Sequence, residues 1–144
     1  MSDKKADYVK QEMAKLAKAA DNGISENETI LVQRTIRSGQ TVRYSGHIVI
    51  LGDVNPGAEI IAGGNIMVLG CLRGIAHAGA LGNQLAVVAA FRLEPTQLRI
   101  ANHITRAPDG ENWQPQEPEV AKIKNGVVVI EKLQAIGERY LNLC

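Results

Sequence analysis

The residue types best suited to catalysis in this chain are its three histidines, His47, His77 and His103. A histidine can act as a general base or ligate zinc, and His77, in the segment RGIAHAG, is the best candidate for the single base of a solenoid acyltransferase. Cys71 and Cys144 lie far apart and form no metal or redox motif. No nucleotide-binding or hydrolase motif is present. We therefore expect no catalytic residue, metal site or cofactor, and we expect His77 to hold a structural hydrogen bond.

A second group of polar residues has the spacing of a binding surface. The segments Arg37-Ser38-Gly39-Gln40, Asn55-Pro56-Gly57-Ala58 and Arg73-Gly74-Ile75-Ala76 follow one another at a constant 18-residue step. If that step is one turn of a coil, Arg37, Asn55 and Arg73 form a polar ladder beside a glycine-rich backbone. A planar guanidinium with a neighbouring amide and hydroxyl suits a partner that carries carboxylates. The alternative is a solvated polar corner with no partner.

The elements that position these residues follow from an internal repeat. Gly46, Gly64 and Gly82 recur at the same 18-residue step and open the similar runs GHIVILGD, GNIMVLGC and GNQLAVVA. One such repeat has the length of three short strands and three corners, and stacked copies can bury an apolar face that one copy cannot. The repeat predicts an all-β triangular solenoid of four to five turns over about residues 29–109. The alternative is an ordinary α/β domain, and the period alone leaves the handedness open.

The same repeat predicts columns of residues that stack from turn to turn. One column at each strict 18-residue step holds Ile36, Val54, Leu72 and Ala90. Two others hold Leu31, Val49, Met67, Leu85 and His103, and Gln33, Leu51, Leu69, Val87 and Thr105. Gly39 and Gly57 share a corner position, where glycine allows a positive φ.

One strand of the repeat, HIVIL, NIMVL or NQLAV, is apolar on both faces. Alternate residues of a strand point to opposite sides. We expect the interior to take the set Val49, Leu51, Met67, Leu69, Leu85 and Val87. The outward strip is then expected to hold Ile48, Ile50, Ile66, Val68 and Ala86. An apolar strip of that size calls for a cover, and a two-fold homodimer is the simplest one. The alternative cover is a terminal helix.

Composition excludes several classes of protein. The 144 residues suggest one domain, and a hydrophobic content of 45% argues against a disordered chain. With 16 Lys and Arg against 15 Asp and Glu, the net charge of +1 gives no support for nucleic-acid binding. No apolar run reaches the length of a membrane span, and residues 1–22 lack the apolar core of a signal peptide. Aromatic residues are only 3%, which fits a narrow interior filled by small and branched side chains.

The two ends of the chain carry other patterns. Residues 3–20 have one apolar stripe at helical spacing, and Asp21-Asn22-Gly23 is typical of a helix end. Residues 107–119 are rich in proline and polar residues and are expected to form a loop. Asn125-Gly126 between two apolar runs predicts a hairpin that protects the edge of the last turn. A short helix is expected within residues 131–143.

Three segments resemble the C-terminal domain of the MinC family of septum site-determining division inhibitors. They are IRSGQ at 36–40, GDVNPGAEIIAGGNIMVLGCLRGIAHAGA at 52–80 and PEVAKIKNGVVVIEKL at 118–133. The resemblance covers about residues 29–133. It implies a short right-handed triangular β-helix that dimerises through one apolar face. It also implies binding to the ATP-bound dimeric form of the membrane ATPase MinD, through a motif that matches Arg37, Ser38, Gly39 and Gln40; by stacking, Asn55 and Arg73 are expected beside it.

The resemblance implies a cytoplasmic protein that reaches the inner membrane only through MinD. There it would antagonise the tubulin-like FtsZ, and alternating MinC and MinD dimers could form copolymers. Relatives carry an N-terminal α/β domain with the main FtsZ-inhibiting activity, whereas here residues 1–28 are expected to be a helix or linker. The chain is then expected to consist of three parts: a helix or linker at residues 1–28, the β-helix domain at 29–133 and an extension at 134–144. The resemblance assigns FtsZ inhibition mainly to that N-terminal domain, with at most a weaker contribution from residues 29–133, and we expect the N-terminal domain to have been removed or to be naturally absent.

Two other functions stay open. A self-assembling scaffold of the bactofilin type would use open solenoid ends. A hexapeptide-type acyltransferase centred on His77 would need a regular six-residue apolar signature, which the repeat lacks.

Overall fold

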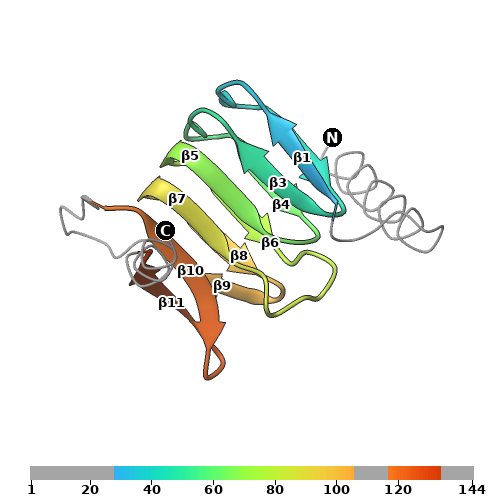
Figure 1. The fold of residues 1–144 in the computed structure, drawn as a ribbon, viewed down its shortest axis with the longest axis vertical. Helices are drawn as coiled ribbons and strands as arrows, with labels where there is room; N and C mark the ends of the chain where they lie inside the picture. The colour runs from blue at the N-terminus through green and yellow to red at the C-terminus, as the bar shows by residue number, and fades with distance from the viewer. Residues whose placement is uncertain (1–27, 106–116, 134–144) are drawn as a thin grey trace, which may run out of the picture.

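The computed structural model describes residues 28–105 and 117–133, and within these ranges the chain is built of β-strands alone. Figure 1 shows the strands as successive rungs of a coil. The strands are β1 (Thr29–Val32), β2 (Thr41–Tyr44), β3 (His47–Ile50), β4 (Glu59–Ala62), β5 (Ile66–Leu72), β6 (Ile75–Ala78), β7 (Val88–Leu93), β8 (Gln97–Ile100), β9 (His103–Thr105), β10 (Glu119–Lys124) and β11 (Val127–Lys132).

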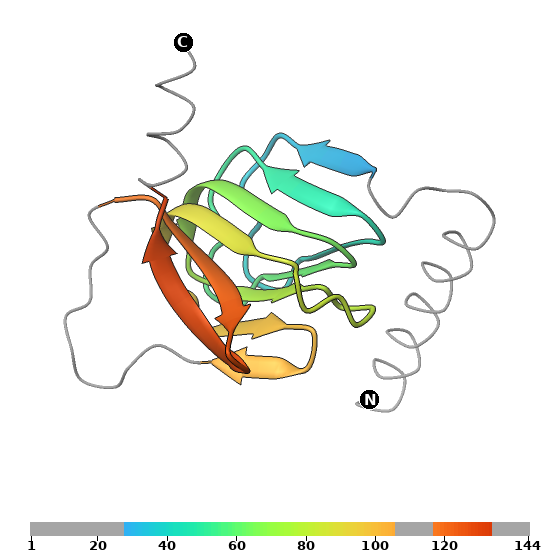
Figure 2. The ribbon, with the colours of Figure 1, turned by 60° about the horizontal axis from the view of Figure 1, so that its bottom comes forward.

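The coil has three sides, and Figure 2 shows it obliquely with β10 and β11 in front. The first sheet has the strand order β1-β3-β5-β7-β10-β11, and the second sheet has the order β2-β4-β6-β8-β9. The third side is narrower and is held by the parallel bridges Ile36–Val54 and Val54–Leu72. Neighbouring strands of successive turns are parallel, because each turn repeats the path of the one before it. The predicted β-solenoid is confirmed.

The 18-residue register holds for the first three turns of the first sheet and then changes. Ile48 pairs with Ile66 at the 18-residue step, whereas Ile66 pairs with Val88 at a 22-residue step. The longer connection at residues 79–87 causes the shift. The columns predicted for the fourth turn are therefore wrong: Ala89, not Leu85, lies beside Met67. Leu93, not Ala90, lies beside Leu72.

The described part of the coil ends after its fourth turn. β9 reverses and pairs with β8 in antiparallel fashion, with His103 opposite Ile100 and Thr105 opposite Leu98. Ala101 makes this reversal with a φ of 52°. The positions predicted for His103 and Thr105 in the stacked columns are wrong for this reason, and β9 does not begin a fifth turn.

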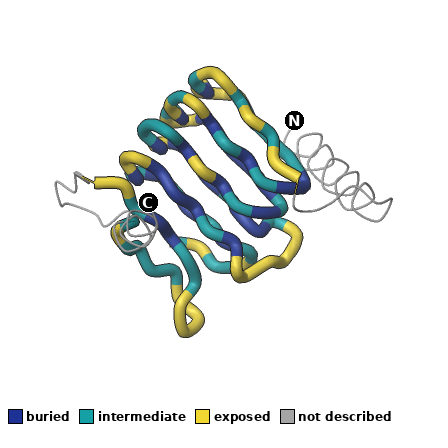
Figure 3. Tube along the Cα trace, viewed as in Figure 1, coloured by how far each residue is buried: buried dark blue, intermediate teal, exposed yellow. Residues whose placement is uncertain are grey.

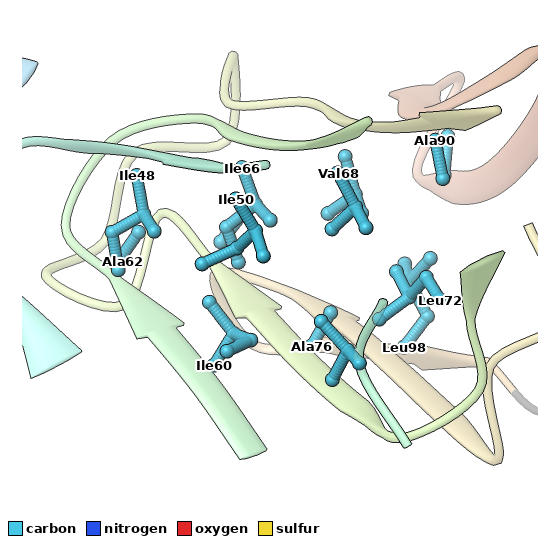
Figure 4. Packing of buried hydrophobic residues seen from close by; sticks show 14 of the residues in the cluster. Ile48, Ile50, Ile60, Ala62, Ile66, Val68, Leu72, Ala76, Ala90 and Leu98 are labelled. Atoms are coloured by element: carbon cyan, nitrogen blue, oxygen red, sulfur yellow. The ribbon is translucent and has the colours of Figure 1, made fainter. Parts of the chain in front are cut away.

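The interior is filled by the apolar set that the sequence analysis placed outside. The side chains of Ile48, Ile50, Ile66 and Val68 are fully buried, and Ala86 is 1% exposed. Figure 4 shows the four β-branched side chains beside Leu72, at the end of β5, and beside Ile60 and Leu98 from the second sheet. These five residues cannot form the predicted outward strip. The alternate set faces outward instead, with Met67 44% and Leu51 38% exposed.

Both apolar sets satisfy the alternation of a strand, so hydrophobicity alone does not decide which one turns inward. The direction in which the chain turns at each corner decides it. Four of the five interior residues are β-branched, and such side chains pack well against neighbours on a pleated surface. The outward set also contains Val49 and Val87, so branching does not distinguish the two faces.

The C-terminal end of the coil is covered by antiparallel strands. β10 and β11 form the predicted hairpin, with Asn125 and Gly126 at φ values of 53° and 81° in its turn. β10 also pairs with β7 and so protects the edge of the first sheet, as predicted. β9 covers the edge of the second sheet. This cover argues against assembly end to end at the C-terminal end.

Other predictions for the ends fall outside the described residues. The helix expected at residues 3–20 and most of the loop expected at 107–119 lie there. Glu119 already belongs to β10, and β11 continues to Lys132, so the helix expected from residue 131 does not begin there.

Candidate functional site

The predicted polar ladder is present at the corner where the third side meets the second sheet. The bridges between Ile36, Val54 and Leu72 bring the residues that follow them, Arg37, Asn55 and Arg73, into one row. The Asn55 amide donates to the Ile36 carbonyl at 2.9 Å, and the Arg73 amide donates to the Val54 carbonyl at 2.8 Å. The stacking of Arg37, Asn55 and Arg73 inferred from the 18-residue spacing is confirmed. The rest of the third segment departs from it, because Ile75 pairs with Glu59 and Ala76 with Ile60 at a 16-residue step. The fourth turn adds Glu94 to the row, because its amide donates to the Leu72 carbonyl.

Two equivalent β-turns form the outer edge of this corner. The Gln40 amide donates to the Arg37 carbonyl at 2.9 Å, and the Ala58 amide donates to the Asn55 carbonyl at 3.0 Å. The third residue of each turn is a glycine with a positive φ, 85° at Gly39 and 87° at Gly57, as a type II turn requires. The Gly39 amide donates to the Gly57 carbonyl at 2.9 Å, so the predicted glycine column is confirmed.

Ser38 and Gln40 have different surroundings within the first turn. The Ser38 side chain lies over Gly57, where an added Cβ would collide with its Oγ. The Gln40 Oε1 atom accepts hydrogen bonds from the Arg37 amide at 2.8 Å and from Nη1 of Arg34 at 3.1 Å. Arg34 and this use of Gln40 were missed by the sequence analysis, because a lone arginine six positions before Gln40 carries no motif.

The two arginines of the ladder differ in their electrostatic surroundings. Nε of Arg73 lies 3.4 Å from Oε2 of Glu94, and the Arg73 side chain is 53% exposed. An exposed pair of this kind contributes about 0–1 kcal/mol, so it orients Arg73 more than it stabilises the fold. Arg37 is exposed and forms no ion pair with another residue of the described ranges. Of the two arginines of the ladder, Arg37 is therefore the one whose charge is open to an acidic partner.

A second candidate surface is the outer face of the first sheet. Four large apolar side chains lie exposed there on neighbouring rungs, with Leu31 53%, Leu51 38%, Met67 44% and Phe91 52% exposed. Val49 pairs with both Leu31 and Met67 and lies half-buried between them. Figure 3 shows exposed and half-buried segments along these outer rungs. We call these residues the outer apolar face; it takes the place of the strip predicted from Ile48 and its neighbours.

His77 lies on the outer side of the second sheet and has a structural partner. Its Nε2 lies 2.9 Å from the carbonyl of Ala101, so the neutral ring carries its proton on Nε2. Burial lowers the pKa of His77, and the Ala101 carbonyl acts in the opposite direction. The adjoining hollow, lined by Glu59, Ile75, His77, Gln97 and Arg99, has a volume of about 100 Å³. That is smaller than the roughly 300–1,000 Å³ of sites for drug-sized ligands, and it gives no support to an acyl-carrier substrate.

The remaining candidates for chemistry stay apart. His47 lies in the first sheet and accepts a hydrogen bond from the Asn65 amide at 2.8 Å, whereas His103 lies on β9 of the second sheet, two strands from His77 on β6. Nowhere in residues 28–105 and 117–133 do three His, Cys, Asp or Glu residues gather as a metal site would need. Cys71 is a free, half-buried thiol. The described part of the chain contains no helix able to span a membrane.

A short β-solenoid with a polar corner and an outer apolar face is the architecture of a protein-interaction module. Residues 30–133 match the family described as septum formation inhibitor MinC, C-terminal domain, and the chain belongs to that family. A probable septum site-determining protein MinC of Heliobacterium modesticaldum is 66% identical over 107 residues, covering 74% of this chain and 37% of the relative. The corresponding protein of Clostridium acetobutylicum is 53% identical over 110 residues, covering 76% and 52%.

The fold has a counterpart among solved structures. The MinC:MinD cell division protein complex of Aquifex aeolicus contains a chain that is 42% identical, with a TM-score of 0.73. The match covers 81% of this chain and 95% of that chain. The present chain spans about half the length of the curated relatives that it matches.

Proposed function

We propose that residues 29–133 form the MinD-binding module of a division-site regulator, and that Arg37, Ser38, Gly39 and Gln40 form the centre of its docking site. The observation that carries the proposal is the turn at 37–40, which presents an exposed arginine on a rigid, hydrogen-bonded corner. Asn55 and Arg73 extend the site along the ladder. The relationship to a chain of a MinC:MinD complex supports MinD as the partner.

The chemistry of the corner fits an acidic protein surface. A guanidinium binds a carboxylate with two parallel hydrogen bonds, and a rigid turn loses little conformational entropy on binding. Hydrogen bonds within and between turns fix the backbone at Gly39 and Gly57. We infer a binding module rather than an enzyme, and we infer that the ATP-bound form of MinD is the one recognised.

We propose further that two copies associate through the outer apolar face. Leu31, Leu51, Met67 and Phe91 would then be covered in the dimer, as exposed apolar patches of soluble proteins commonly are. We also propose that the coil is right-handed, as the resemblance implies. A dimer presents two polar corners, and bivalent contact with a dimeric MinD raises avidity and permits copolymers.

In this scheme a cytoplasmic chain reaches the inner membrane only through MinD. Antagonism of FtsZ would follow from that recruitment, with this module contributing weakly or depending on an N-terminal domain. No contact with nucleic acid is proposed.

Co-sedimentation with MinD and lipid vesicles, in ATP or in ADP, tests this function. We expect the wild-type chain to sediment with vesicles only when MinD and ATP are present. Arg37→Ala should reduce the bound fraction about tenfold or more, because it removes the guanidinium at the centre of the proposed site. Lys124→Ala, which removes an exposed charge on the hairpin, is the matched control and should bind normally. Failure of a folded wild-type chain to bind would overturn the proposal.

A further inference from the structure

The first described turn of the coil lacks the support that each later turn receives at the ladder. The amides of Asn55, Arg73 and Glu94 each donate to a carbonyl of the preceding turn, at 2.9, 2.8 and 2.9 Å. Arg37 holds the equivalent position in the first turn, where no preceding rung of the described chain offers a carbonyl. Its amide donates instead to Oε1 of Gln40 at 2.8 Å. The Gln40 side chain thus takes the place of a preceding rung.

The bonds between Arg37 and Gln40 run in both directions. The Gln40 amide donates to the Arg37 carbonyl, and the Arg37 amide donates to the Gln40 side chain. This reciprocal pattern resembles a capping box, in which a side chain three residues on satisfies an orphan amide. In the second turn the residue equivalent to Gln40 is the buried Ala58, which has no acceptor in its side chain. None is needed there, because the amide of Asn55 already donates to the Ile36 carbonyl.

The same Gln40 oxygen also binds the guanidinium of Arg34, a second arginine at this corner. Nη1 of Arg34 donates to Oε1 of Gln40 at 3.1 Å, so one atom accepts both the Arg37 amide and the Arg34 guanidinium. A carbonyl oxygen has two lone pairs, and both are used here. Arg34 is exposed, as is Arg37, and the two guanidiniums share one end of the ladder.

We propose that Gln40 is a positioning residue, which fixes the Arg37 turn and Arg34 through Oε1, and that Arg34 joins Arg37 as a cation of the docking site. This inference rests on the proposed docking function. The chemical requirement at position 40 is an acceptor oxygen, and the amide hydrogens of Gln40 are dispensable. The partner surface should offer carboxylates to both arginines.

Two substitutions at position 40 separate positioning from direct contact. Gln40→Glu keeps an acceptor oxygen, removes the amide donors and adds a negative charge beside Arg34 and Arg37, whereas Gln40→Leu removes the acceptor at similar size. We expect Gln40→Leu to bind ATP-loaded MinD about tenfold more weakly than wild type, because the turn and Arg34 lose their shared acceptor. Gln40→Glu should also bind more weakly, because its carboxylate pairs with the two arginines and repels an acidic partner, but the Arg37 amide should keep its acceptor. Gln84→Leu, at an exposed glutamine of the 79–87 connection, is the control and should be silent.

Hydrogen exchange of the Arg37 amide, followed by NMR, gives a readout that needs no partner. Protection should persist in Gln40→Glu and Arg34→Ala and fall about fivefold or more in Gln40→Leu, which leaves that amide without its acceptor. Arg34→Ala should still weaken binding about fivefold to tenfold through the lost charge. Circular dichroism should show all variants folded.

Other results would overturn the inference. If Gln40→Leu loses binding while the Arg37 amide stays protected, Gln40 contacts the partner directly and is not a positioning residue. Normal binding by Arg34→Ala removes Arg34 from the site. If the wild-type chain does not bind MinD, the proposed function fails, and the amide measurement alone decides the role of Gln40: unchanged protection in Gln40→Leu contradicts positioning.

Discussion

Met67 and Val68 are neighbours in β5, yet Val68 is fully buried in the coil and Met67 is 44% exposed on its outer side. The alternation of a strand separates the two by one step. Val68 contributes to the core, and Met67 contributes to the outer apolar face. The two positions therefore allow the core and the proposed dimer interface to be disturbed separately.

Met67→Asp should give a folded monomer, because a carboxylate in the centre of an apolar interface loses hydration without gaining a partner. Sedimentation velocity measures the change, and circular dichroism reports the fold. Val68→Asp places the same group in the interior and should prevent folding. A folded Met67→Asp variant that sediments as wild type would remove the outer apolar face from the interface.

The interior set should govern stability. Ile50→Ala leaves a cavity in a column that Val68 and Val32 share, and the free energy of unfolding should fall by about 2–5 kcal/mol. Val127 lies 58% exposed on the hairpin, and Val127→Ala should change the same quantity by less than about 0.5 kcal/mol. Urea unfolding measures both variants. Equal effects would contradict the burial assigned to Ile50.

Gly39 and Gly57 have nearly the same φ but different surroundings, which makes them a matched pair. An added Cβ at Gly39 meets nothing within 4 Å, whereas at Gly57 it collides with Ser38. Gly39→Ala should cost about 1 kcal/mol from the positive φ alone. Gly57→Ala should cost about 1 kcal/mol more and weaken MinD binding, because it displaces Ser38.

The control for the glycine pair is a second change at Ser38. Ser38→Gly in the Gly57→Ala chain should recover the steric part of the loss in unfolding free energy, with little effect in the Gly39→Ala chain. Equal losses in the two alanine variants, with no recovery, would exclude the contact between Ser38 and Gly57 as the cause.

His77 should make the fold sensitive to acid. Burial lowers its pKa below the ordinary value of 6.5, so the unfolded chain binds a proton at this site more readily than the folded chain. Stability is therefore lost as the pH falls through 6.5 toward the lower folded value. His77→Gln keeps a donor for the Ala101 carbonyl and does not titrate in this range. Urea midpoints measured at several pH values should fall less steeply for His77→Gln than for wild type, and identical slopes would contradict the prediction.

Features with a local or periodic cause could be predicted from the sequence. The 18-residue glycine spacing indicated the coil and the row of Arg37, Asn55 and Arg73, because stacked turns repeat their corners. Asn125-Gly126 indicated the hairpin, since two positive φ values in succession favour those residues. The family followed from three segments that carry these same corners.

The tertiary structure decided what periodicity leaves open. The longer connection at 79–87 moves β7 to a 22-residue step, so a constant period of 18 residues misplaces the strands of the first sheet after Ala78. Ala101 reverses the chain, so the same period wrongly places β9 in a fifth turn. The contacts of Gln40 follow from its place in the first described turn, where no preceding rung of the described residues offers the Arg37 amide a carbonyl. Met67 and Val68 are both apolar, and only the direction of the chain at the corners sends one outward and the other inward: a strand with two apolar faces carries no record of which face is the interior.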